Sequence, residues 1–432
     1  MRKLYGDIVI PEFTLLKGDC LETLKGIASC SIDSVICDPP YHLQSITKRF
    51  GGDNSAEAKY GSDGLFQRSS KGFMNKTWDG GDIAFRTDVW KECYRVLKPG
   101  GHLLAFGGTR TIHRITSAIE DSGFEVRDLL CWIQYQGFPK SRNISLDIDK
   151  QIYGDKNRGH GVTHMATQKG FNKPQSVRDG LDPYQPNSIE AQKWAGFGTA
   201  LKPSHEPATI ARKPIEKGLS IAKNVLKWGT GAMNIDSCRL KPGDPAWPGP
   251  NGELDYCQSS DSNVYGSYMD GSGQKYKGNH EPTKMESRSH PLGRWPANIY
   301  QCPKPSRKEK EAGLSHLDFK TGFDMNGRKE ENIGHEYAHA GAGRTSEEVR
   351  NTHPTIKPRG IIEWAIRLLT PPGGVVLDPF AGSGTTGVSS IVQGFDCILC
   401  ELTPEYWPII EGRVTEAYRE WKEANRQYKL FE

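Results

Sequence analysis

Apolar runs alternate with amphipathic segments at both ends of the chain, and glycine or proline follows most of them. The apolar runs predict strands at 13–18, 32–37, 102–106, 126–134, 208–212, 375–378 and 397–401. Helical spacing of apolar residues predicts helices at 21–27, 87–97, 111–122, 221–226, 361–369, 385–394 and 405–421. The sequence Lys98-Pro99-Gly100-Gly101 is expected to end the second of these helices. This alternation predicts an α/β fold with a doubly wound, mostly parallel sheet.

Two long stretches interrupt the pattern. Segment 44–81 is dominated by small and polar residues and directly follows Tyr41, so it either closes over a ligand held there or forms a disordered insertion. Between about 238 and 330 periodic hydrophobicity almost disappears, while tyrosines and basic residues continue. We therefore expect one α/β domain built from 1–215 and 346–432, with a loop-rich region inserted at 216–345.

Composition narrows the class of protein. The chain has 432 residues, and its 48 Gly and 27 Pro agree with long irregular segments. With 56 Lys and Arg against 52 Asp and Glu, the net charge is only +4, so any surface for a polyanion must be local. The 10 Cys have no disulfide-like spacing, and neither a signal peptide nor an apolar run of the ~20 residues of a membrane span is visible. We expect a soluble, cytoplasmic protein with no membrane partner.

The sequence Asp38-Pro39-Pro40-Tyr41 follows the apolar run 32–37. Proline lacks an N–H and disfavours further pairing, so the strand must end there. Asp38 and Tyr41 are therefore expected at the carboxyl end of a strand, where open α/β sheets bind their ligands.

A second strand end carries a glycine-containing loop. Its residues are Asp378, Pro379, Phe380, Ala381, Gly382, Ser383 and Gly384. Glycines let a ligand approach the backbone, and Glu401 ends the following strand at close to the ~20-residue interval of a ribose-binding acid. Gly387 would complete a dinucleotide fingerprint, but an acid at Asp378 suits a cationic amino group better than a pyrophosphate. The loop thus favours S-adenosylmethionine over NAD.

Together these motifs resemble those of DNA amino-methyltransferases. The third motif of the resemblance is His353-Pro354-Thr355-Ile356-Lys357-Pro358. The order of the three is similar to that of the permuted beta class, in which the catalytic tetrapeptide comes first and the cofactor loop near the C-terminus. Segments 201–207 and 293–298 also resemble a bacterial and phage subgroup of this family.

The resemblance implies a Rossmann-like methyltransferase fold and S-adenosylmethionine as cofactor. We expect no metal site. The resemblance also implies that the loop 378–384, with Asp38, lines the cofactor and that Glu401 holds the ribose hydroxyls. Asp19 would contact the adenine ring of the cofactor, and His353 and Lys357 would lie near its carboxylate. It further implies that the inserted region 216–345 recognises the target.

The implied substrate is an exocyclic amino group of a base in double-stranded DNA. The Asp38 carboxylate and the Pro39 carbonyl accept its two N–H groups, and Tyr41, beside Pro40, stacks on the flipped base. Aspartate as the first residue of the tetrapeptide favours adenine N6 in this family, and cytosine N4 is the alternative. The sequence has no Pro-Cys dipeptide, which a C5-cytosine enzyme would be expected to use.

More remote alternatives stay open. An RNA methyltransferase or a protein amide methyltransferase is one, although protein amide enzymes usually carry Asn in place of Asp38. A zinc peptidase using His335 and His339 is another, but the glycines around this His-Glu-x-x-His pattern disfavour the helix it requires. Cys397 and Cys400 are expected to face opposite sides of a strand and to be packing residues. A homodimer and a cognate restriction enzyme are partners that the sequence does not decide.

Overall fold

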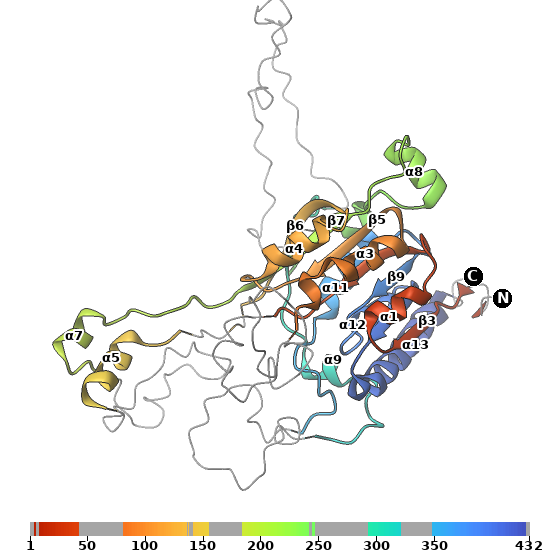
Figure 1. Ribbon diagram of the computed structural model, residues 1–432. Helices are drawn as coiled ribbons and strands as arrows, with labels where there is room; N and C mark the ends of the chain where they lie inside the picture. The colour runs from red at the N-terminus through yellow and green to blue at the C-terminus, as the bar shows by residue number, and fades with distance from the viewer. Residues whose placement is uncertain are drawn as a thin grey trace, which may run out of the picture.

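A computed structural model describes residues 4–5, 8–42, 81–135, 137, 141–154, 184–241, 244–246, 293–320 and 348–428. Within these residues the main sheet has the strand order β3-β10-β9-β4-β5-β7-β6-β8 (Figure 1). In that order the strands are Phe13–Lys17, Asp396–Glu401, Val375–Asp378, Ile32–Cys37, Leu97–Phe106, His205–Arg212, Glu125–Ile133 and Ile299–Gln301. A separate short hairpin joins β1 (Leu4–Tyr5) to β2 (Ile8–Val9).

Strand direction changes only around β7 in this sheet. The pairs β3–β10, β10–β9, β9–β4, β4–β5 and β6–β8 are parallel, whereas β7 is antiparallel to both β5 and β6. The prediction of a mostly parallel sheet is therefore confirmed. As a consequence, β7 begins at the edge where its neighbours end.

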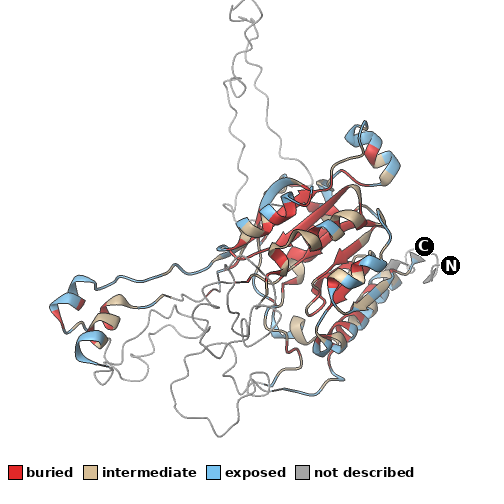
Figure 2. Cartoon of the chain, viewed as in Figure 1, coloured by how far each residue is buried: buried red, intermediate tan, exposed pale blue. Residues whose placement is uncertain are grey.

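Helices cover both faces of the sheet (Figure 1), which makes it doubly wound as predicted. One face packs against α1 (Cys20–Thr23), α3 (Thr87–Val96) and α4 (Ile112–Glu120), and the other against α11 (Arg359–Leu369), α12 (Thr385–Val392) and α13 (Trp407–Tyr428). Because side chains alternate along a strand, Val35 joins the first core and Ile36 the second. Figure 2 shows the buried residues concentrated in the strands.

Shorter elements complete the described chain. Five are single turns, namely η1 (Leu24–Gly26), η4 (Ile83–Phe85), η5 (Asp236–Cys238), η7 (Pro404–Tyr406) and α9 (Arg307–Glu311). The helix α8 (Ile221–Trp228) was predicted, whereas α5 (Ile144–Tyr153) and α7 (Ile189–Lys193) were not. The last two lie away from the sheet (Figure 1), where the Asp149 carboxylate joins them by accepting hydrogen bonds from the backbone and hydroxyl of Ser188.

The helix α3 ends at Val96, just before the sequence 98–101 that was expected to stop it, but β5 begins at Leu97 and not at the predicted His102. Leu97 pairs with Ile32 and His102 with Ser34, so β5 bulges between the two pairs. Lys213 beyond β7 donates its N–H to the Gly101 carbonyl and accepts from the Gly100 N–H, at 2.9 and 3.0 Å. These bonds keep the segment extended. Gly100 fits there at φ +84°, a conformation that other residues rarely adopt.

Part of the region predicted to be an insertion belongs to the main sheet. The strand β8 pairs with β6, and Cys238, Leu240 and Tyr300 are buried in the same core as α11. The division at 215 and 345 stays a prediction. Segment 44–81 lies outside the described residues apart from Gly81. None of the helices in the described ranges is long and apolar enough to cross a bilayer.

Candidate active site

Four predicted site residues lie at one edge of the sheet. Asp38, Asp378, Glu401 and Asp19 follow or end the strands β4, β9, β10 and β3, which are parallel neighbours in the sheet. Carboxyl ends of adjacent parallel strands meet at the same edge, so residues far apart in the chain come together. The strand β7 is antiparallel to β5, so its first residues lie at the same edge. Glu206, the second residue of β7, therefore joins the site.

The Asp38 carboxylate is paired with a buried lysine. Lys357, just before α11, places its Nζ atom 2.6 Å from Oδ2 of Asp38. The same Nζ lies 2.9 Å from the Tyr41 hydroxyl and 3.1 Å from Oε2 of Glu206. The Tyr41 hydroxyl in turn donates to Glu206 Oε2 at 3.0 Å. These four side chains form one closed polar cluster, here called the Asp38 cluster.

One oxygen of Asp38 is left over. Oδ1 is buried and accepts no hydrogen bond from any described residue. A buried carboxylate oxygen without a donor is costly, and native proteins rarely keep one without a reason. The Asp38 side chain lies directly after β4, at the carboxyl edge of the sheet, and its Oδ1 atom has unused acceptor capacity there.

The cluster shifts the pKa values of its members. Burial raises the pKa of Asp38, the Lys357 ammonium offsets part of this rise, and the Glu206 carboxylate adds to it. Burial also acts to raise the pKa of Glu206, but the ammonium and the hydrogen bonds from Lys357 and Tyr41 outweigh it and hold that pKa below its usual range. Burial opposes the charged form of Lys357, yet the two carboxylates raise its pKa above normal. Lysine therefore stays charged between two acids.

The loop after β9 is held in shape by carboxylates. The Phe380 N–H and the Thr386 hydroxyl donate to the two oxygens of Asp378, at 2.9 and 2.6 Å. Glu401 accepts from the Gly382 N–H at 2.7 Å, which ties the loop to β10. Burial raises the pKa of Asp378 to about 7, against the lowering effect of its own hydrogen bonds. Asp378 thus orders the loop from within.

The glycines of this loop are required by its conformation. Gly382 has φ +54°, and a Cβ atom there would lie 2.7 Å from Nε2 of His353. Gly384, at φ +77°, is the N-cap of α12 and would place a Cβ 3.0 Å from Ile410. A larger residue at either position would therefore strain the backbone and fill the space beside the loop.

Two further predicted residues are placed differently from each other. His353 lies against Gly382 of the loop after β9. Its ring packs edge-on to that of Tyr406, with ring centroids 4.7 Å apart. Asp19 is exposed and caps α1 by accepting from the Leu21 N–H at 2.8 Å. Whether these residues and the others of the loop contact a cofactor stays a prediction.

Comparison with known proteins places the chain in a family. The pattern of the DNA methylase family of N6/N4 type matches residues 32–412, most of the chain. The chain belongs to this N6/N4 DNA methylase family.

Individual relatives share between 14% and 32% sequence identity with the chain. The type II methyltransferase M.HindIII of Haemophilus influenzae is 25% identical over 52% of the chain, and M.HinfI of Haemophilus influenzae is 32% identical over 28%. The matched parts are 65% and 31% of those proteins' own lengths. A solved structure titled PvuII DNA methyltransferase, cytosine-N4-specific, has 14% identity and a TM-score of 0.41, covering 96% of this chain and 95% of that one.

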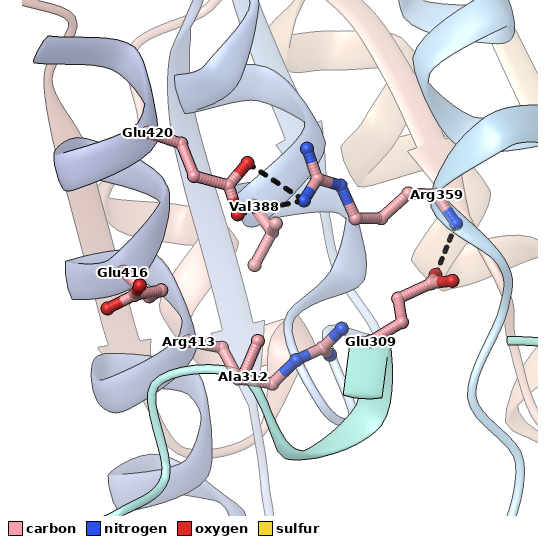
Figure 3. A pocket seen from close by; sticks show the side chains of 7 residues that line it. All are labelled: Glu309, Ala312, Arg359, Val388, Arg413, Glu416 and Glu420. Atoms are coloured by element: carbon pink, nitrogen blue, oxygen red, sulfur yellow. Dashed lines mark hydrogen bonds and ion pairs between the residues drawn. The ribbon is translucent and has the colours of Figure 1, made fainter. Parts of the chain in front are cut away.

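Sequence reasoning missed two residues of this methylase site. Glu206 is the second residue of β7, and its signal was an acid before a proline and an apolar run, inside a segment that resembled the family. Arg413 of α13 is buried behind the loop, where it donates to the Ser383 carbonyl at 2.7 Å and to the Thr385 hydroxyl at 3.1 Å. Burial lowers the pKa of Arg413 to about 10. Figure 3 shows its side chain beside Glu309, among the residues of α9, α11, α12 and α13 that line a pocket.

The remaining sequence candidates do not enter the site. Cys397 and Cys400 are buried in the cores on opposite faces of the sheet, so the expected packing role is confirmed. His335 and His339 lie outside the described residues. Within the described ranges, no group of three or more His, Cys, Asp or Glu side chains is arranged to hold a metal ion.

Proposed function

We propose that this family member transfers a methyl group from S-adenosylmethionine to the N6 amino group of adenine in double-stranded DNA. The observation that carries the proposal is the Oδ1 atom of Asp38, which is buried without a donor at the carboxyl edge of the sheet. Family membership supports DNA as the substrate.

The residues present fit the cofactor. The loop after β9 lies at the carboxyl edge of the parallel strands, and Glu401 is fixed at the end of the next strand by the Gly382 N–H. The loop 378–384 and Glu401 would hold the cofactor, with Asp19 and His353 at its periphery. When bound, S-adenosylmethionine supplies an activated methyl group on a sulfonium.

The chain's own task is to prepare the nucleophile. An exocyclic amino nitrogen is a poor nucleophile because its lone pair is delocalised into the ring. Asp38 Oδ1 and the Pro39 carbonyl would accept its two N–H groups and so favour a more tetrahedral nitrogen with its lone pair available. The Asp38 cluster has two carboxylates and one ammonium, and this net negative charge stabilises the positive charge that builds on the nitrogen.

The base must leave the duplex to reach this edge of the sheet. Tyr41 would stack on the flipped base, and its hydroxyl is held by Glu206 and Lys357, which fixes one end of the ring. Such stacking contributes about 1–3 kcal/mol per base in single-strand binders. Cytosine N4 carries the same pair of N–H donors and is the second candidate, and aspartate at position 38 favours adenine.

The experiment is methyl transfer with a labelled cofactor. Amplified genomic DNA carries no methyl marks and contains every short recognition sequence, so it can serve as substrate before the recognition site is known. Digestion to nucleosides then assigns the label to N6-methyladenine or N4-methylcytosine. Label in RNA or protein and none in DNA would overturn the proposal. Sedimentation with and without DNA would test the homodimer, and protection of methylated DNA from nucleases would test a restriction partner.

A further inference from the structure

The resemblance implied that Lys357 lies near the cofactor carboxylate, but its ammonium is committed elsewhere. An ammonium has three N–H donors. Asp38 Oδ2, the Tyr41 hydroxyl and Glu206 Oε2 lie within 3.1 Å of Nζ and account for all three. The Lys357 side chain is only 8% exposed. It has no donor left for a third carboxylate unless the Asp38 cluster breaks.

We propose that Lys357 and Glu206 are positioning residues for Asp38. Lys357 holds Oδ2 so that Oδ1 faces the amino group of the substrate, and Glu206 holds Lys357 and the Tyr41 hydroxyl in register. The inference rests on the proposed function, since it gives Asp38 the task of accepting an N–H group.

The surroundings of Lys357 fix its ammonium in place. Nζ lies 5.2 Å from the ring centroid of Tyr41, 5.1 Å from that of Phe106 and 5.9 Å from that of Trp132. Aromatic faces attract a cation and exclude other positions for it. Lys357 also comes from the opposite end of the chain to Asp38, so the contact forms only when both parts of the sheet are assembled.

A positioned ammonium also keeps Asp38 in the form that accepts hydrogen bonds. A buried carboxyl tends to keep its proton, and a protonated carboxyl is a weaker acceptor that can present its own O–H to the N–H group of the substrate. Glu206 has the opposite influence, because a second negative charge favours protonation of Asp38. Two titratable groups lie beside Asp38 on the strands, namely Cys37 at the end of β4 and Asp378 at the end of the neighbouring β9. The others that act on Asp38 and Glu206 are Tyr41, Lys357 and Lys304.

The test compares two variants whose effects have opposite signs. Both variants are compared by the rate of single-turnover methyl transfer as a function of pH, and the acid limb is the part of this profile where the rate falls at low pH. Lys357→Met removes the cation, so the acid limb should move to higher pH by about one unit or more. Glu206→Gln removes one negative charge but keeps an oxygen for Lys357 and Tyr41, so the acid limb should move to lower pH. Lys98→Met is the matched control, because Lys98 forms a 2.6 Å ion pair with Asp33 on the same sheet and lies outside the site. Its acid limb should stay at the wild-type pH.

Titration calorimetry with S-adenosylmethionine separates the two roles of Lys357. A positioning role predicts cofactor affinity within about threefold of wild type, whereas loss of a carboxylate contact would weaken binding by about tenfold or more. Weakened binding with an unmoved acid limb would overturn the inference, as would limbs that stay in place in both variants. If Lys357→Met does not fold, the direction of the Glu206→Gln shift decides alone. A wild-type protein that labels no DNA would overturn the proposed function itself, which is a separate outcome.

Discussion

Nζ of Lys357 lies 2.6 Å from Oδ2 of Asp38, although 319 residues separate them in the chain. The contact closes a site whose parts come from both ends of the sequence. The sheet makes this possible because β9 and β10, near the C-terminus, insert between β3 and β4 from the N-terminus. The contact between Lys357 and Asp38 therefore depends on the assembly of strands from both ends of the chain.

The loop glycine Gly382 offers a test of the cofactor site. Gly382→Ala should lower the free energy of unfolding by about 1–2 kcal/mol through its left-handed backbone, and further through the contact with His353. Gly373→Ala is a matched control, since Gly373 also has positive φ, at +70°, but open space around its Cβ position. Urea denaturation should show the larger loss at Gly382, and calorimetry should show weaker S-adenosylmethionine binding only there. Equal losses in both variants would contradict the role of the His353 contact.

Asp378 should make stability depend on pH. Its pKa is about 7 in the folded protein and near 4 when unfolded, so between these values the folded state holds more protons. The stability that this group contributes is complete below pH 4 and is lost as pH rises through 7, by about 4 kcal/mol at most. Asparagine cannot ionise, so the Asp378→Asn variant should not lose this stability. The difference between its free energy of unfolding and that of wild type should therefore shift in favour of the variant as pH rises from 4 to 7. Parallel pH curves for the two proteins would contradict this assignment.

Arg413 should support the loop from behind. Arg413→Met removes the donor to the Ser383 carbonyl and the Thr385 hydroxyl, and we expect a loss of about 2–3 kcal/mol in the free energy of unfolding. Arg419→Met, on the same helix, is the control. Arg419 is 71% exposed and pairs only at the surface with Glu416, so its removal should cost about 0.5 kcal/mol or less. Similar denaturation midpoints for the two variants would show that Arg413 does not support the loop.

Much of the sheet and of its carboxyl edge could be predicted from the sequence, because an apolar run followed by an acid and a proline or glycine indicates the end of a strand. Asp38, Asp378 and Glu401 were placed at one edge of the sheet in this way, and the edge was confirmed. The start of β5 was predicted at 102 and lies at Leu97, since the extended form of 98–101 depends on hydrogen bonds to Lys213, more than a hundred residues away.

Glu206 could not have been placed by local pattern. Its position follows from the reversal of β7 between β5 and β6, and a strand's direction is set by its neighbours and not by its own residues. The contacts of Lys357 could not be predicted from the sequence either. The family resemblance placed Lys357 near the cofactor carboxylate, and only the fold shows that its ammonium contacts Asp38. Arg413 is one of many basic residues in an amphipathic helix until packing buries it.

The most direct test of the central claim is nucleoside analysis of unmethylated genomic DNA after incubation with labelled S-adenosylmethionine, for the wild-type protein and for Asp38→Ala. Removing the acceptor for the amino group should slow transfer by about a hundredfold or more while the cofactor still binds. We predict label in N6-methyladenine with the wild-type protein and almost none with the variant. Label in another nucleoside, or transfer by Asp38→Ala at the wild-type rate, would contradict the account.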